Sequence, residues 1–363
     1  MKNYLRATFE ATANIAVVKY WGKRDEKLIL PTNSNLSFTM DDKLKTRTTV
    51  VFSEDFKEDE LYLNGQKIDL NDQSASERMI QLDLVRKSAG FNHKARVASI
   101  NCFPTAAGFA SSASGMAALA CSSATAANLK LSNKELSILA RRGSGSACRS
   151  VLGGFVQWHR GKNEDGSDSY ASEIFPASHW KELVNVIAVV DSEKKKTSSR
   201  SGMKQTILTS KLFEKRLQTI NETIEDTIRA VEKRDFESFA KLIIKESNNM
   251  HAVMLDTYPP IMYLNDNSRK VIDKIIELNE NKGKMIAGYT FDAGPNAHVY
   301  TIENNLEVVK ETLKEIPGVK ELIVCRIGNG PKQLTNESEH LLTVEGKVKD
   351  MFFDEKTKSI ISR

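Results

Sequence analysis

The chain has 363 residues, which is enough for one large or two ordinary domains with a sizeable core. Fifty-two Lys and Arg against forty-seven Asp and Glu leave a formal charge of +5 spread along the chain, so composition gives no support to nucleic-acid binding and suits small polyanionic ligands. Four scattered cysteines, the lack of a long apolar run and the lack of a hydrophobic signal core predict free thiols in a cytoplasmic protein.

The N-terminal segment predicts a buried strand that ends in a cluster of cations. Residues 7–18 alternate and then become entirely apolar, which predicts one strand entering the interior. Because Lys19 follows this strand directly, we expect its ammonium to be partly buried and to need an anionic partner. Residues 28–40 predict a turn and a second strand. Residues 46–52 and 60–63 predict the two strands of a hairpin, with Asn64-Gly65 as a turn signal.

A small-residue stretch, Pro104–Ser114, follows a predicted helix over 76–89 and a predicted strand over 95–101. A long helix of Gly, Ala and Ser begins within it, so backbone N–H groups there lack intrahelical partners and a phosphate could approach them closely. The stretch matches neither the Walker nor the dinucleotide-binding pattern. A tightly packed core helix with a serine N-cap is the commoner meaning of such a run, so phosphate binding depends on the rest of the chain.

A second small-residue turn, Arg142–Ser150, follows a helix that the capping-box residues Ser132 and Glu135 predict. The turn is rich in hydroxyls, is flanked by arginines and opens a short helix. One Gly-Ser turn usually marks a loop. Two such turns, each placed to begin a helix, favour a ligand with two phosphate-bearing groups. Residues 155–159 then predict a strand that closes this half.

The next stretch predicts a buried strand, a cationic loop and a pair of helices. Residues 183–190 are continuously apolar, and the lysines that follow are either a solvated edge or a cationic flap over a nucleotide. Helical spacing over 213–231 and 239–243 predicts a helical pair that breaks near Met250-His251. We interpret His251 as a structural histidine rather than a ligand contact.

An aspartate at the mouth of a sheet is the most suggestive feature of the C-terminal half. Residues 285–291 and 297–301 predict paired strands joined through Asp292–Asn296. Asp292 could be an Asx-type turn residue or a rigidly placed base, and the pattern leaves both open. Residues 335–363 are mostly polar and are expected to form an appendage.

Four motifs in one order resemble the diphosphomevalonate decarboxylase family of the GHMP kinase superfamily: Asn14–Asp25, Pro104–Ala113, Arg142–Arg149 and Phe291–Asn296. The resemblance implies an α+β fold of the GHMP kinase type with a deep central cleft. The expected division is an ATP-binding domain at 1–190 that is similar to domain 2 of ribosomal protein S5, a ferredoxin-like domain at 191–334, and an extension of unknown role at 335–363.

The resemblance also implies an activity. It is the ATP- and Mg2+-dependent decarboxylation of mevalonate 5-diphosphate to isopentenyl diphosphate, CO2, ADP and phosphate through a 3-phosphorylated intermediate, within the mevalonate pathway of isoprenoid biosynthesis. It further implies a homodimer with no nucleic-acid or membrane partner.

The motifs carry the family's functional residues onto this chain position by position. The implied catalytic residues are Asp292, Lys19 and Arg149. The implied substrate contacts are Asn14, Tyr20, Lys23, Ser144, Ser146 and Arg200. The implied ATP contacts are Pro104, Ala107, Gly108, Ala110, Ser111, Ser112, Ser114 and Lys196, with Ser112 as the candidate contact to Mg2+.

Three alternative functions share part of this residue pattern. The joint presence of Asp292, Lys19 and Arg149 disfavours a mevalonate 3-kinase that stops after phosphorylation, and with an intact phosphate loop it also disfavours a non-catalytic ligand-binding relative. A phosphomevalonate decarboxylase stays open, because the choice depends on how many cations meet the distal phosphate.

Overall fold

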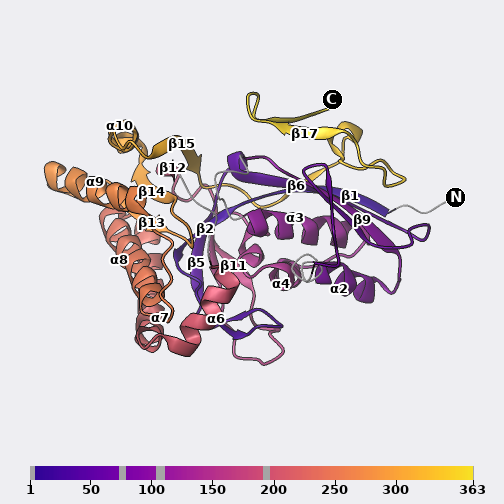
Figure 1. Ribbon diagram of the computed structural model, residues 1–363, viewed down its shortest axis with the longest axis horizontal. Helices are drawn as coiled ribbons and strands as arrows, with labels where there is room; N and C mark the ends of the chain where they lie inside the picture. Colours follow the sequence, from indigo (N-terminus) through magenta and orange to yellow (C-terminus); the bar gives the residue numbers. More distant parts are fainter. Residues whose placement is uncertain (1–4, 73–78, 104–110, 191–196, 363) are drawn as a thin grey trace.

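The computed structural model describes residues 5–72, 79–103, 111–190 and 197–362, and of Ser111 only the backbone. Figure 1 shows two parts side by side, one built on a large sheet with α2–α4 and the other on a smaller sheet with α7–α10. Among the described residues, none of the helices combines the length and apolar character that crossing a membrane would need. All four cysteines are free thiols, as the sequence predicted, and all four are buried.

The first part is a six-stranded sheet in the order β16-β1-β6-β9-β7-β8. Its strands are β1 (Leu5–Thr12), β6 (Lys45–Ser53), β7 (Glu60–Leu63), β8 (Gln66–Ile68), β9 (Lys94–Asn101) and β16 (Lys332–Leu334). Its helices are α2 (Ile80–Ala89), α3 (Ser111–Ala126) and α4 (Asn133–Gly143). Buried alanines and Cys121 of α3 allow this helix to pack closely on β1 and β6.

A four-stranded sheet, β11-β10-β5-β2, lies between the two parts (Figure 1). Its strands are β2 (Asn14–Val18), β5 (Asn35–Thr39), β10 (Phe155–Trp158) and β11 (Ala171–Phe175), and the short helix α5 (Ala147–Ser150) precedes β10. Phe38 of β5 packs on Phe155 and also on Phe239 and Tyr300 of the second part. One hydrophobic core therefore crosses from the central sheet into the second part.

The second part is a four-stranded sheet, β13-β14-β12-β15, with helices packed on it. Its strands are β12 (Leu183–Val190), β13 (Gly288–Phe291), β14 (Ala297–Ile302) and β15 (Val319–Arg326). Its helices are α6 (Ser199–Thr209), α7 (Leu212–Lys233), α8 (Phe236–Leu255), α9 (Asp266–Lys282) and α10 (Leu306–Lys314). Smaller elements are β3 (Lys23–Asp25), β4 (Leu30–Pro31), β17 (Met351–Asp354), β18 (Ser359–Ser362), and the 3-10 helices η1 (Asp42–Leu44), η3 (Glu303–Asn305) and η4 (Glu337–Glu339).

Local signals placed several elements correctly. Ser132 and Glu135 form the predicted capping box of α4, and α2 ends at Gly90 in the left-handed conformation. The apolar run at 183–190 is β12, with every residue buried. In each case the signal acts between residues that are close in the sequence.

Longer-range predictions were wrong in three places. Residues 7–18 form two strands in different sheets, because the chain changes sheets at Ala13, whose N–H donates to the carbonyl of Leu44. The predicted hairpin of β6 with β7 does not form, since Asn64-Gly65 joins β7 to β8 and β7 lies parallel to β9. Helix α8 continues through His251 to Leu255 instead of breaking there.

The C-terminal segment returns to the first part. Strand β16 pairs with β1, and Leu341 and Leu342 are buried against Val51, Ala98 and Ile100 on the face of the sheet opposite α3 (Figure 1). The β17–β18 hairpin lies over the same face. The division of the chain at residues 190 and 334 stays a prediction.

Candidate active site

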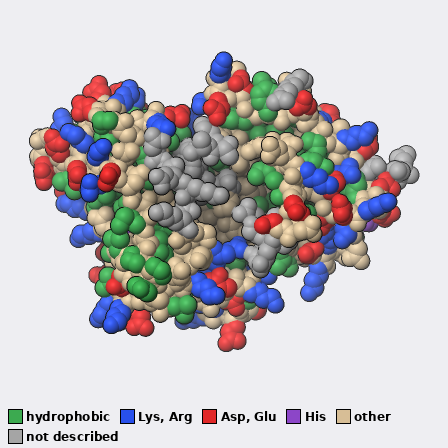
Figure 2. All heavy atoms as spheres, viewed as in Figure 1, with side chains coloured by type: hydrophobic (Ala, Val, Ile, Leu, Met, Phe, Trp, Pro, Cys, Tyr) green, Lys and Arg blue, Asp and Glu red, His purple; other side chains and the backbone are tan. Residues whose placement is uncertain are grey.

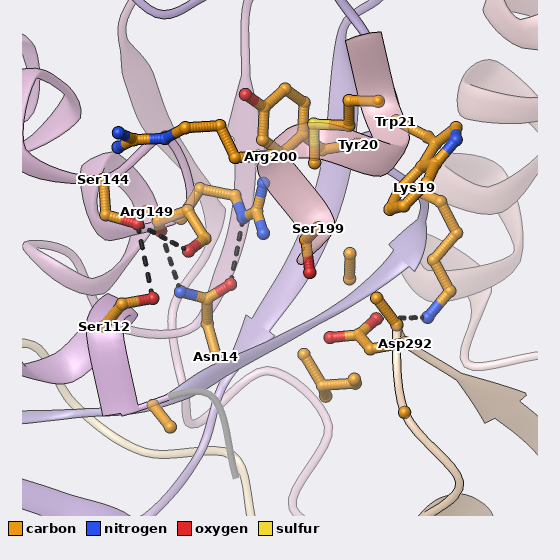
Figure 3. Close-up of a pocket in the computed structure, with 18 of the residues that line it drawn as sticks. Asn14, Lys19, Tyr20, Trp21, Ser112, Ser144, Arg149, Ser199, Arg200 and Asp292 are labelled. Atoms are coloured by element: carbon orange, nitrogen blue, oxygen red, sulfur yellow. Dashed lines mark hydrogen bonds and ion pairs between the residues drawn. The ribbon is translucent and has the colours of Figure 1, made fainter. Parts of the chain in front are cut away.

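A cavity of about 500 Å³ lies between the two parts. Its walls come from the end of β2, the start of α3, the turn between α4 and α5, the start of α6 and the turn after β13. Figure 3 shows side chains from all of these segments turned toward one space. Segments that are far apart in the sequence therefore meet at this cavity.

An ion pair between Lys19 and Asp292 lies in the cavity wall, where Nζ is 2.7 Å from Oδ1 (Figure 3). All five residues of β2 are buried, and the Lys19 side chain beyond them is only 1% exposed. The Asp292 side chain is 46% exposed and opens into the cavity. The sequence predicted an anionic partner for the buried Lys19, and that partner is the Asp292 carboxylate. Because Asp292 is partly exposed, a ligand in the cavity can still contact it.

The two charges shift one another's pKa. Burial lowers the pKa of Lys19 below 10.5, although the Asp292 charge opposes this. Burial by itself raises the pKa of Asp292, but the charge and hydrogen bond of Lys19 outweigh it, so the pKa lies below 3.8. Asp292 is therefore ionised at neutral pH and can accept a hydrogen bond or a proton.

The backbone around Asp292 is held by its neighbours. The N–H of Phe291 donates to Ser247 Oγ of α8 at 2.9 Å, and the N–H of Gly294 donates to the carbonyl of Asp292 at 2.8 Å. The backbone closes the turn, and the carboxylate contacts Lys19. This arrangement leaves the side chain available for a ligand.

Arg149 is fixed by an amide network. Its Nε donates to Asn14 Oδ1 at 3.0 Å, and its Nη1 donates to Asn35 Oδ1. The Asn14 amide in turn donates to Ser146 O at 3.0 Å and to Ser150 Oγ at 2.7 Å. Because these partners are neutral, the guanidinium keeps its full charge for an anionic ligand, although burial lowers its pKa.

The start of α3 and the turn between α4 and α5 meet at the cavity. Ser144 Oγ lies 3.4 Å from Ser112 Oγ at the start of α3 and 3.5 Å from Ser146 Oγ (Figure 3). Ser114, in contrast, is fully buried against Thr46 of β6, 2.8 Å between hydroxyl oxygens, and is not among the described residues that line the cavity. Pro104, Ala107, Gly108, Ala110, Lys196 and the side chain of Ser111 lie outside the described residues.

The remaining predicted substrate contacts also line the cavity. The Tyr20 ring packs on Trp158, with 4.7 Å between ring centroids, and its hydroxyl is buried with no hydrogen-bond partner in the described part of the chain. Lys23 is buried and pairs with Glu26. Arg200, at the start of α6, extends across the cavity on the side of Tyr20 (Figure 3).

Sequence reasoning missed the residues that hold the Lys19 backbone. Glu246 Oε1 accepts the Lys19 N–H at 2.8 Å, and Arg216 donates to both Glu246 oxygens. The Lys19 carbonyl accepts hydrogen bonds from Asn33 at 3.0 Å and from Arg216 at 3.4 Å. Both charged residues lie on the apolar face of a helix, Arg216 between Phe213 and Ile220. A charged residue at a position where the helical pattern predicts burial would have identified Arg216 and Glu246 from the sequence.

The described residues fit Mg2+ bound mainly through nucleotide phosphates. No group of three or more His, Cys, Asp and Glu side chains in the described ranges could hold a metal by itself. Magnesium usually keeps few protein ligands and takes oxygens from phosphate and water. The oxygens of Ser112 and Asp292 face the cavity where such an ion would lie.

Two family models match this chain. They are the diphosphomevalonate decarboxylase-like N-terminal domain, over residues 11–171, and the mevalonate 5-diphosphate decarboxylase C-terminal domain, over residues 185–321. The diphosphomevalonate decarboxylase of Homo sapiens is 41% identical and covers 93% of this chain and 96% of its own. That of Candida albicans is 43% identical and covers 92% and 98%.

Solved structures agree with the sequence matches. Mevalonate diphosphate decarboxylase from Staphylococcus aureus superposes with a TM-score of 0.86 at 34% identity, covering 92% of this chain and 99% of its own. A structure described as MDDEF in complex with MVAPP, AMPPCP and magnesium gives a TM-score of 0.84 at 38% identity, covering 92% and 100%. These matches confirm the expected α+β fold of the GHMP kinase type. The chain belongs to the diphosphomevalonate decarboxylase family.

Proposed function

We propose that the cavity is the site of an ATP-dependent decarboxylation of mevalonate 5-diphosphate, with Asp292, Lys19 and Arg149 as the catalytic residues. The activity is that of the family: it yields isopentenyl diphosphate, CO2, ADP and phosphate in the mevalonate pathway. The observation that carries the assignment of the site is the 2.7 Å ion pair between the buried Lys19 and the accessible Asp292.

The geometry suits a reaction in two steps. A tertiary hydroxyl is a poor leaving group, so ATP first phosphorylates it, and ADP leaves. The bond between the substrate and its carboxylate carbon then breaks, which releases CO2, and its electron pair forms the carbon–carbon double bond. Phosphate departs with the electron pair of the bond between the tertiary carbon and oxygen. Asp292 orients the hydroxyl and takes its proton, which suffices because phosphoryl transfer depends mainly on positioning and charge stabilisation.

The other two catalytic groups act on charge. Lys19 keeps Asp292 ionised and offsets the charge that develops beside it. Arg149 presents a planar fork that matches the substrate carboxylate, and its rigid hold by Asn14 and Asn35 fixes the direction of that fork. Arg200, Tyr20 and the hydroxyls of Ser144 and Ser146 are placed for the diphosphate.

ATP and Mg2+ are the expected cofactors, because a related structure holds an ATP analogue together with magnesium. Ser112 at the beginning of α3 is a described hydroxyl that would meet the nucleotide phosphates, 3.4 Å from the hydroxyl of Ser144 on the substrate side. Mg2+, when bound, supplies charge neutralisation of those phosphates. The start of α3 adds backbone N–H groups without intrahelical partners.

The test offers the purified protein mevalonate 5-diphosphate, mevalonate 5-phosphate and mevalonate, each with MgATP, and measures CO2 and ADP. We expect equal amounts of the two products and a preference for the diphosphate. ADP without CO2 would indicate a mevalonate 3-kinase. A preference for the monophosphate would overturn the substrate assignment.

We also infer a homodimer in the cytoplasm that binds neither membrane nor nucleic acid. Free, buried cysteines support a reducing compartment. Lys and Arg are interspersed with Asp and Glu on the face in Figure 2, whereas nucleic-acid binding requires a cationic patch. Sedimentation would test the dimer, which is expected at twice the 40.6 kDa of one chain.

A further inference from the structure

A buried histidine lies beside the proposed base and has no role in the mechanism above. His298 of β14 is 7% exposed and lines the same cavity as Asp292. We propose that His298 is a positioning residue for Asp292, held by Asn185 so that its Nε2–H faces the carboxylate. The proposal rests on the proposed role of Asp292 as the base.

Strand register places His298 between the segments that carry Asp292 and Asn185. Thr290 of β13 lies directly opposite His298, and Asp292 follows two residues later, in the turn just after β13. On β12, Ile187 lies opposite His298, and Asn185 is two residues before it. Side chains two residues apart along a strand share a face, and diagonal neighbours on paired strands are within reach of each other. In the order β13-β14-β12, His298 lies between Asp292 and Asn185.

Asn185 determines which ring nitrogen carries the proton. Its amide nitrogen donates to His298 Nδ1, 3.1 Å away, and also to Met40 Sδ, 3.6 Å away. A neutral histidine ring carries one proton. Because Nδ1 of His298 accepts a hydrogen bond, that proton is on Nε2. Nε2 is the ring nitrogen that Asn185 does not contact, and His298 and Asp292 line the same cavity, so we infer that Nε2–H faces the carboxylate.

A neutral donor fits this position better than a second cation. The groups that act on His298 are Asp292 and Lys19, while Cys325 of β15 lies beyond Asn185, directly opposite it. Burial lowers the pKa of His298 to about 4, so the ring is uncharged at neutral pH. Lys19 already stabilises the carboxylate, and a further full charge would make it a weaker base. A neutral N–H can orient Asp292, directly or through one water, and it lowers the basicity of the Asp292 carboxylate less than a positively charged ring would.

The test compares four variants with the wild-type enzyme in steady-state kinetics on mevalonate 5-diphosphate and ATP. His298→Leu should lower kcat by about tenfold or more while both KM values stay within about threefold. His298→Gln should keep kcat within about threefold, because its amide NH2 reaches the Nε2 position. His340→Leu is the matched control: His340 is also 7% exposed and lies in the C-terminal segment, and we expect near-wild-type kcat.

The fourth variant, Asn185→Asp, separates a proton-position role from packing. A carboxylate accepts the Nδ1 proton, so at neutral pH Nε2 no longer donates to Asp292 and kcat should fall. The same carboxylate raises the pKa of His298 and offsets the charge of the doubly protonated ring, so kcat should recover in part as the pH is lowered and Nε2 donates again. The wild-type enzyme should show no such recovery.

The outcomes distinguish this proposal from the proposed function. An inactive wild-type protein would refute the function itself. With an active wild type, unchanged kcat in His298→Leu, equal losses in the Leu and Gln variants, or a pH profile of Asn185→Asp parallel to the wild type would each refute the positioning role. Should the Leu variant fail to fold, the Gln and Asp variants still decide the question.

Discussion

The ion pair that holds the Lys19 backbone gives a quantitative prediction. Arg216 and Glu246 have side chains that are 1% and 4% exposed, and Glu246 Oε1 also accepts the Lys19 N–H at 2.8 Å. Glu246→Gln keeps the shape and one acceptor oxygen but leaves the buried guanidinium without a counter-charge. Breaking a buried pair costs about 3–5 kcal/mol. Since about 1 kcal/mol corresponds to roughly 2–4 °C in a large domain, we expect Tm to fall by about 10 °C.

Thermal unfolding followed by circular dichroism measures this change. The matched control is Asp226→Asn on α7, the helix that carries Arg216; Asp226 pairs with Arg229, and their side chains are 38% and 58% exposed. An exposed pair contributes about 1 kcal/mol or less, so Tm should move by no more than a few degrees. If Glu246→Gln shifted Tm no more than this control, the buried Arg216–Glu246 pair would contribute no more stability than an exposed pair.

Three further predictions concern the chemistry. Asp292→Asn should leave ATP and substrate affinity within about threefold in calorimetry but nearly abolish turnover, and near-normal turnover would contradict the assigned base. Arg149→Gln should lower kcat more than it weakens binding of the substrate's diphosphate end; an effect on affinity alone would remove Arg149 from the chemistry. Because burial lowers the pKa of Lys19, the alkaline limb of kcat/KM should lie below pH 10.5. The lowered pKa of Asp292 means that this group contributes no acid limb above pH 3.8.

Several features of the site could be predicted because their physical signal is local. The apolar run of β2 ends at a lysine, so a buried ammonium and its need for an anion follow from adjacent residues. Ser112 lies in the first turn of α3 and Ser144 lies just before α5, so unsatisfied N–H groups at the start of each helix also follow. The order of the four motifs identified the family, which the comparisons confirm.

The contacts that complete the site could not be predicted in this way. Lys19 and Asp292 are 273 positions apart, and Lys19 and Glu246 are 227 apart. Which carboxylate meets Lys19 depends on how two sheets pack, and a residue pattern within one strand carries no information about the other sheet. The same limit explains why residues 7–18 were predicted as one strand, since both halves of the run are apolar.

Sequence by itself determined the types of side chain available, the C-terminal end of α2, the capping box of α4 and the family. Tertiary structure alone decided that Ser114 is buried in the core, that Glu246 and Arg216 hold the lysine backbone, and that Asn185 donates to His298 at the cavity that Asp292 lines. The physical reason is the separation in sequence over which each interaction acts. Capping, turn formation and periodic burial act between near neighbours in the chain, whereas strand register and the packing of one sheet on another bring together residues that the sequence keeps far apart.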